Sequence, residues 1–161
     1  MATLTVTVKE AITLNNIDYG SERALDISSV NEVVKRVVTA STTECGLIGF
    51  ISAISGVGVT ANKVGYVAGI FDNGDVRYIR ITNLDSSNHI VLTFRDEDNT
   101  EFKMKVDAGH SFIYPGDNSG GVGDTMKAAG SALASGIDNL TDITVDADTA
   151  ACDVEVFVAS A

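Results

Sequence analysis

The chain has 161 residues, of which 45% are hydrophobic and 20% charged, and this composition predicts one globular domain over residues 1–161. Its 22 acidic residues outnumber its 11 basic residues, so the net charge is −11. Because proteins that bind phosphates present a basic face, this charge argues against nucleic acid and against an anionic membrane as partners. No stretch of about 20 apolar residues is present, and the first residues alternate instead of forming an apolar signal core. We therefore expect a soluble protein without a targeting segment.

Alternation of apolar with polar residues predicts strands along most of the chain. Leu4, Val6 and Val8 alternate with threonines in the first of them, and the same period of two recurs up to the C-terminus. The predicted strands cover residues 2–9, 33–40, 45–52, 66–71, 76–82, 89–95, 101–107, 110–114, 142–146 and 152–159. Half-buried strands with one wet face are typical of antiparallel sheets.

Residues 30–38 also fit a helix. Their valines recur at helical spacing, and Ser29 with Glu32 would form a capping box. However, four of the eight residues from 33 to 40 are valine, and β-branched side chains favour strands. A strand is therefore the preferred prediction.

Asn73-Gly74 predicts a type I′ hairpin between residues 66–71 and 76–82. Polar reversals at 83–88, 96–99 and 107–109 extend this to four successive strands, either a meander or part of a Greek key. Residues 116–136 hold six glycines and predict one long loop, in which Met126 to Ala129 could form a single helical turn. The predicted fold is all-β: an antiparallel two-sheet sandwich, jelly-roll-like, with this Gly-rich loop.

Three glycine-rich or acidic segments match ligand-binding motifs only in part. Residues 56–61 carry the letters of a dinucleotide fingerprint, but the following residues do not predict the helix that it needs. Residues 120–124 are a single degenerate copy of a calcium-binding repeat, and residues 96–98 lack the glycine and glutamate of a calcium loop. We interpret these segments as loops.

The sequence gives little sign of catalytic chemistry. His110 precedes Ser111, but neighbouring residues on a strand face opposite ways, so a shared proton is not expected. His89 has no nucleophile motif near it, and a Gly-x-Ser-x-Gly elbow is absent. With only two cysteines and two histidines, no zinc spacing is present either. We predict that the protein is not an enzyme, with no catalytic, cofactor-binding or metal-ligating residue and no cofactor.

The remaining candidates are structural. Cys45 and Cys152 stand in apolar contexts and are expected to be buried thiols, with a disulfide as the alternative. Four aromatic residues are expected in the core, with surface contacts as the alternative: Tyr66, Tyr78, Phe112 and Tyr114. Thr3, Thr5 and Thr7 form a polar stripe on a terminal strand, which either adds to a neighbour's sheet or is an ordinary wet edge. Asn139 begins a glycosylation sequon, which matters only in a secreted protein.

Three segments resemble small virion structural proteins of tailed bacteriophages. They are RYIRITNLDSSN at residues 77–88, VDAGHSF at 106–112 and LTDITVDADTAACDVEVF at 140–157. The resemblance covers roughly residues 77–158 and, weakly, 31–43; the loop at 116–136 has no counterpart in it. It implies an all-β protein, often trimeric, that decorates or cements a capsid or belongs to the tail, and it carries over no catalytic residues.

The first functional expectation is therefore a capsid decoration or cement protein. It would bind the major capsid protein or other virion proteins and would bind neither nucleic acid nor a membrane. It would be part of a virion that assembles in a bacterial cytoplasm. A tail-tube, baseplate or fibre-associated component is the alternative within the virion. The alternative of another class is a calcium-dependent carbohydrate-binding β-sandwich that uses loops 96–99 and 116–124. The absence of tryptophan argues against carbohydrate binding.

Overall fold

The computed structural model describes residues 1–51, 65–96, 101–114 and 140–161. Within these ranges the chain forms strands and no helix, and therefore no helix that could span a membrane. The strands are β1 (Ala2–Glu10), β2 (Thr13–Leu14), β3 (Ile17–Asp18), β4 (Ser21–Val30), β5 (Glu32–Ala40), β6 (Cys45–Ile51), β7 (Gly69–Asp72), β8 (Val76–Asn83), β9 (Ile90–Asp96), β10 (Glu101–Val106), β11 (Ser111–Tyr114), β12 (Leu140–Ala147) and β13 (Cys152–Ser160).

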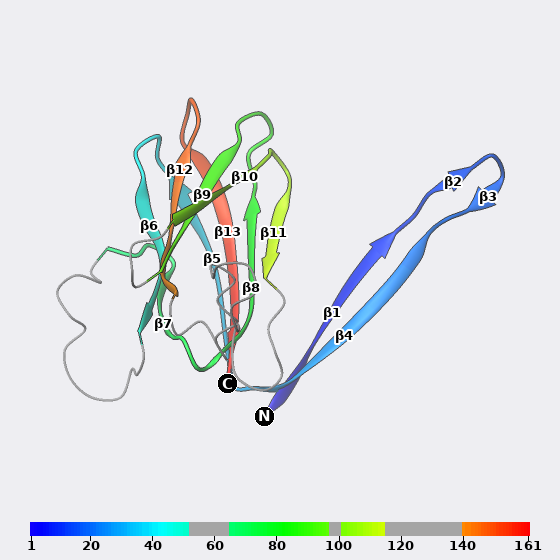
Figure 1. Ribbon diagram of the computed structural model, residues 1–161, viewed down its shortest axis with the longest axis horizontal. Coiled ribbons are helices and arrows are strands. Elements are labelled where there is room, and N and C mark those ends of the chain that lie inside the picture. The colour runs from blue at the N-terminus through cyan, green and yellow to red at the C-terminus, as the bar shows by residue number, and fades with distance from the viewer. Residues whose placement is uncertain (52–64, 97–100, 115–139) are drawn as a thin grey trace, which may run out of the picture.

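Nine strands form the body of the molecule, a sandwich of two sheets (Figure 1). The five-stranded sheet has the order β10-β9-β12-β6-β7, and the four-stranded sheet has the order β11-β8-β13-β5. The remaining strands, β1 to β4, form a long hairpin that projects from the side of the four-stranded sheet (Figure 1). We call this hairpin, residues 2–30, the arm.

The core between the sheets follows from the alternation along each strand. In β13, buried Cys152, Val154, Val156 and Val158 face inward. In β9, Ile90, Leu92 and Phe94 do the same from the opposite sheet. The ring of Phe94 stacks on Phe102 at 4.5 Å and lies 5.1 Å from Phe112 of the facing sheet. Burial of these side chains from both layers provides the main stabilisation of the body.

All ten predicted strands are present, and the all-β sandwich is confirmed. The segment that also fitted a helix is a strand: β5 pairs with β13 along its whole length, from Ala40 opposite Cys152 to Glu32 opposite Ser160. Assignment of the sandwich to the jelly-roll class stays a prediction.

The hairpin predicted at Asn73-Gly74 is wrong. Neither residue has the positive φ that a type I′ turn requires, and β7 and β8 belong to different sheets. The turn is held instead by Asp72, whose carboxylate accepts a hydrogen bond from the Gly74 N–H at 3.0 Å. Because Phe71 and Val76 are both buried between the layers from opposite sheets, the connection crosses the sandwich.

Of the two predicted arrangements of these four strands, the meander is wrong, because the chain passes between the two sheets at β7–β8 and again at β8–β9. Part of a Greek key stays a prediction. Only β9 and β10, the last two of the four, form a hairpin. One pair in the body is parallel, in contrast to the antiparallel expectation: β6 pairs with β7, with Ile48 opposite Gly69 and Phe50 opposite Phe71.

Several predicted features lie outside the described residues. They are the fingerprint-like segment 56–61, the calcium-like segments 97–98 and 120–124, the Gly-rich loop 116–136 and the sequon residue Asn139.

Candidate functional site

The arm is a two-stranded antiparallel hairpin whose register is unbroken from Leu4 opposite Ile27 to Leu14 opposite Ile17. At its tip, Asn15 and Asn16 have φ values of 53° and 63°. Two consecutive left-handed residues make a type I′ turn, whose twist matches that of the flanking strands, and asparagine tolerates this conformation well. The tip turn therefore follows from local sequence chemistry.

One face of the arm is largely apolar. Residues directly opposite in an antiparallel pair point to the same side, and successive residues on one strand alternate. The register places these cross-strand pairs on one face: Leu4 and Ile27, Val6 and Leu25, Val8 and Arg23, Glu10 and Ser21, Ile12 and Tyr19, Leu14 and Ile17. We call this the apolar face; only its middle is polar.

The apolar face is uncovered beyond the base of the arm. Val8 and Leu25 are 47% and 44% exposed, and the four large side chains near the tip are 54–60% exposed: Ile12, Leu14, Ile17 and Tyr19. Large exposed apolar side chains that gather on one surface mark interaction sites.

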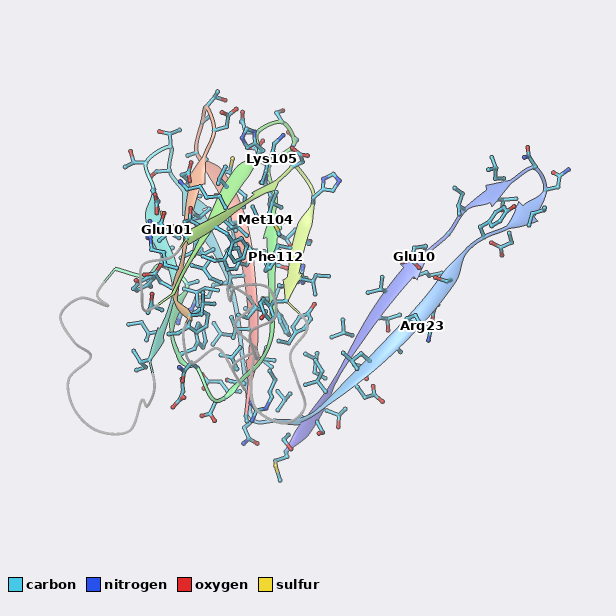
Figure 2. The ribbon with its side chains drawn as sticks, in the orientation of Figure 1. Glu10, Arg23, Glu101, Met104, Lys105 and Phe112 are labelled. Carbon is cyan, nitrogen blue, oxygen red and sulfur yellow. The ribbon has the colours of Figure 1, made fainter. Side chains whose placement is uncertain are left out.

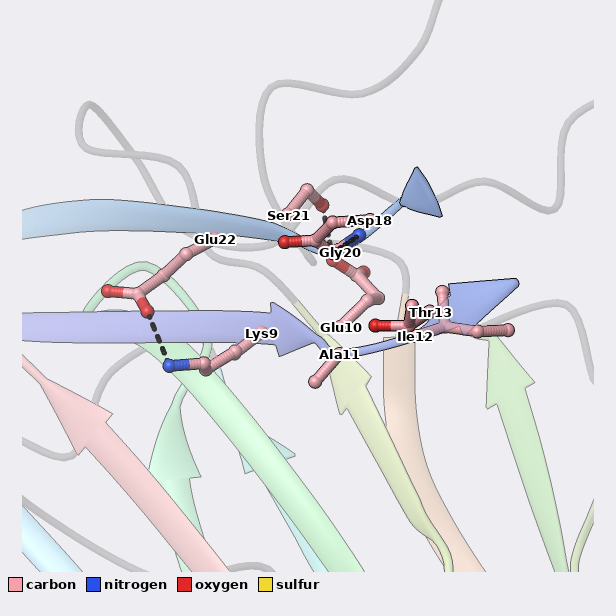
Figure 3. Close-up of a pocket in the computed structure, with 9 residues that line it drawn as sticks. All are labelled: Lys9, Glu10, Ala11, Ile12, Thr13, Asp18, Gly20, Ser21 and Glu22. Atoms are coloured by element: carbon pink, nitrogen blue, oxygen red, sulfur yellow. Dashed lines mark hydrogen bonds and ion pairs between the residues drawn. The ribbon is translucent and has the colours of Figure 1, made fainter. Parts of the chain in front are cut away.

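The opposite face of the arm is polar and internally paired. Thr5 donates a hydrogen bond to Asp26 at 2.7 Å, and Lys9 forms an ion pair with Glu22 at 3.2 Å. In Figure 3, Lys9 points toward Glu22. On the apolar face, Glu10 turns toward Ser21 and accepts a hydrogen bond from its hydroxyl. Such contacts set the register of the hairpin but contribute little stability in water.

The base of the arm is anchored to the body by a second, smaller core. Ile27 and Val30 are buried together with Tyr78 and Ala159 on the outer face of the four-stranded sheet. Leu4, Val6 and Phe157 pack against this cluster as partly buried residues. The Asn31 N–H also donates to the Ser160 carbonyl at 2.9 Å, which fixes the start of β5.

A bulge lies within this anchor, between Ile27 and Val30. Ala2 is opposite Val30 and Leu4 is opposite Ile27, so β4 carries one more residue than β1 between these pairs. Ser29 within the bulge has a φ of 61°, a rare conformation for a residue with a side chain. Because bulges bend a strand and increase its twist, we infer that this one sets the direction in which the arm leaves the sheet.

No family model, curated protein or solved structure matches the chain. Function is therefore inferred from the arm and from the other described side chains.

The second concentration of polar side chains lies on the outer face of the five-stranded sheet, around Arg95. Its guanidinium contacts the carboxylates of Glu44 and Glu101 and lies 3.6 Å from Asp142. The hydrogen bond to Glu101 is the largest cause that raises the pKa of Arg95, and the hydrogen bond to Glu44 adds to it. A hydrogen bond from Thr144 is the largest cause that lowers the pKa of Glu44. The group is an internally paired network.

Tyr66 completes this network. Its ring covers Gly46 and Gly49 of β6, where no side chain stands in the way, and its hydroxyl donates to Asp142 at 2.7 Å. Burial is the largest cause that raises the pKa of Tyr66, and the hydrogen bond to the Asp142 carboxylate is the next. The phenol therefore stays protonated. Within the described ranges no group of three His, Cys, Asp or Glu side chains could hold a metal ion.

The two histidine candidates contact groups other than a serine or cysteine in the contacts that the described residues make. His110 bonds through Nδ1 to the Ala108 carbonyl at 2.9 Å, whereas the Ser111 hydroxyl pairs with that of Thr82 at 2.8 Å. His89 lies 3.6 Å from Asp148.

The two cysteines are free thiols in different sheets, Cys152 buried and Cys45 partly buried. Burial is the main cause that raises the pKa of Cys152, which keeps it protonated and unreactive. Cys152 therefore matches the predicted buried thiol, Cys45 is only partly buried, and the alternative of a disulfide is wrong.

The aromatic residues divide between core and surface. Tyr78 is buried, and Phe112 and Tyr114 pack against the main core as predicted, whereas Tyr66 lies on the outside of a sheet. The threonine stripe on β1 does not lie at an edge of the body; it belongs to the polar face of the arm.

The exposed residues of β2 to β4 were not predicted as a site from the sequence. A signal was available: Asn15-Asn16 between Leu14 and Ile17 has the composition of a two-residue hairpin turn.

Proposed function

We propose that the chain is a non-enzymatic structural protein of a bacteriophage particle, and that it decorates or cements the capsid. The observation that carries the proposal is the arm: six large apolar side chains stand exposed on a hairpin that extends away from the folded body (Figure 2). Such an element offers apolar surface that a neighbouring protein can bury.

Two further features support the proposal. The net charge of −11 suits a protein that contacts other proteins of a particle without binding its packaged DNA. The resemblance of residues 77–88, 106–112 and 140–157 to small virion proteins of tailed phages points to the same class. Repetition over a symmetric shell strengthens each modest contact through avidity.

The test begins with purified particles of the phage that encodes the chain. Quantitative mass spectrometry is expected to find hundreds of copies per particle, as a shell component requires. A few copies would move the protein to the tail, and no copies would overturn the virion role.

A second experiment addresses stabilisation of the shell. Particles that lack the protein are expected to release their DNA at a lower temperature than intact particles. Addition of the purified protein should restore the original temperature. Equal release temperatures for intact and depleted particles would contradict the cement role.

A further inference from the structure

Among the described residues, the large apolar side chains on the outer half of the arm are exposed. An isolated two-stranded hairpin is marginally stable in water and needs a further strand or a packing surface on its apolar side. At the base this surface is the four-stranded sheet, on which Leu4, Val6 and Ile27 pack. Beyond the base, the same face of the arm continues through Val8 and Leu25, which are 47% and 44% exposed in the described part of the chain.

The outer face of the four-stranded sheet is likewise only partly covered. The base of the arm packs on Tyr78, Phe157 and Ala159 of this face. On the neighbouring edge strand β5, Val33 lies opposite Ala159 and is 51% exposed, and Val37 lies opposite Glu155 and is 57% exposed. An apolar strip on β5 therefore borders the existing contact.

These two uncovered surfaces are continuations of one interface. The apolar face of the arm and the outer face of this sheet already pack together within the chain, and each extends past the region of contact. The arm points away from its own sheet (Figure 1), so its outer half and the β5 strip lie apart within one molecule.

The charges on the two surfaces are paired locally. Lys35 stands between Val33 and Val37 on the same face of β5 and forms an ion pair with Glu155 of the same chain at 3.0 Å. On the apolar face of the arm, the two charged residues Glu10 and Arg23 have opposite signs.

We propose that the outer half of the arm docks on the β5 strip of a second copy of this chain, Val33 and Val37 receiving the tip residues Ile12, Leu14, Ile17 and Tyr19. The inference rests on the proposed assembly role and names the neighbour that the arm contacts. Copies linked in this way would form an oligomer before or during attachment to a particle.

The direct test places a photo-crosslinking phenylalanine analogue at Tyr19 in the full chain. Isotope-labelled and unlabelled protein are mixed, so that mass spectrometry separates crosslinks between copies from those within one copy. We expect crosslinks between copies that end in residues 32–40. The matched control carries the analogue at Thr7, on the polar face, and should give few. Crosslinks confined to one copy, or ending elsewhere on the body, would overturn the proposal.

Sedimentation velocity supplies an independent measurement. The unmodified chain is expected to self-associate, and Ile17→Glu and Val37→Glu should each weaken association at least about tenfold, because each replaces a buried apolar contact with a charge. Thr7→Glu should not. An unmodified chain that stays monomeric at all concentrations would overturn arm exchange. The virion role would still stand if that monomer binds particles, so the two failures are distinguishable.

Discussion

The hydroxyl of Tyr66 donates a hydrogen bond to the carboxylate of Asp142 at 2.7 Å, while the ring lies flat over two glycines of the neighbouring strand. A Cβ atom at Gly46 would come within 2.8 Å of the ring, closer than real contacts allow. Tyr66 therefore occupies space that only glycine at this position leaves open.

We predict that Gly46→Ala displaces Tyr66 and lowers the free energy of unfolding by about 1–3 kcal/mol, the usual cost of overpacking. Urea unfolding at neutral pH measures this loss. The control is Gly74→Ala, where the nearest atom, Asp72 Oδ1, would lie 3.5 Å from the new Cβ. If both variants unfold at the same urea concentration as the parent protein, the packing of Tyr66 on β6 is wrong.

Ile27 is fully buried at the base of the arm. Because truncating such a side chain to alanine costs about 2 kcal/mol or more, Ile27→Ala should loosen the anchor and leave the body folded. Hydrogen exchange is expected to rise at the Asn31 amide, which donates to Ser160, by about an order of magnitude or more. Ile17→Ala, at the exposed tip, should leave that amide unchanged. Equal protection of Asn31 in both variants would show that Ile27 does not anchor the arm.

Two substitutions of Ser29 in the bulge are predicted to change the stability of the fold differently. With φ at 61°, valine at this position should cost about 1–2 kcal/mol, because the left-handed conformation brings Cβ close to the following carbonyl oxygen. Ser29→Gly removes this conflict and should be neutral or stabilising. Thermal unfolding of the two variants distinguishes them. A valine variant as stable as the glycine variant would rule out the left-handed bulge.

The carboxylate of Glu155 lies between Lys35 at 3.0 Å and Arg80 at 2.6 Å. Its hydrogen bonds, first to Lys35 and then to Arg80, lower the pKa of Glu155 below its ordinary value of 4.5. A lowered pKa in the folded state means that this group stabilises the fold above pH 4.5, and that the contribution is lost as pH falls through the lowered value.

The parent protein should therefore be more stable than Glu155→Gln at pH 7, and the difference should shrink progressively below pH 4.5. Urea unfolding across this pH range measures it. Glu22→Gln, which removes only the exposed pair with Lys9, should have a small effect at any pH. A constant difference between Glu155→Gln and the parent protein from pH 7 to pH 3 would contradict this assignment.

The strands of the body could be predicted because each carries its own period of two, as in Leu92 and Phe94 of β9. Their partners could not. The turn at Asn73-Gly74 has the composition of a tight hairpin, yet a local turn preference is on the order of 1 kcal/mol, and burial of Phe71 and Val76 from opposite sheets outweighs it. Sheet membership is thus decided by the whole core.

The first strand of the arm was predicted, but its partner β4 was not, for a related reason. β4 begins with Ser21, Glu22 and Arg23 and has no continuous apolar alternation, and most of its residues are exposed. Its apolar residues become a pattern only once the register pairs them with β1, as Leu25 does with Val6. The interaction surface is therefore a property of two strands together, which neither strand carries alone.

The most direct test of the structural role is rebinding to particles from which the protein has been removed. Purified chain is added to such particles, and the bound copies are counted by mass spectrometry for the parent protein, for Ile17→Glu at the arm tip and for Thr7→Glu on the polar face. We predict that the parent protein and Thr7→Glu restore the original copy number, and that Ile17→Glu binds far fewer copies. If the parent protein does not rebind, or if all three proteins bind equally, the arm does not attach this protein to its assembly.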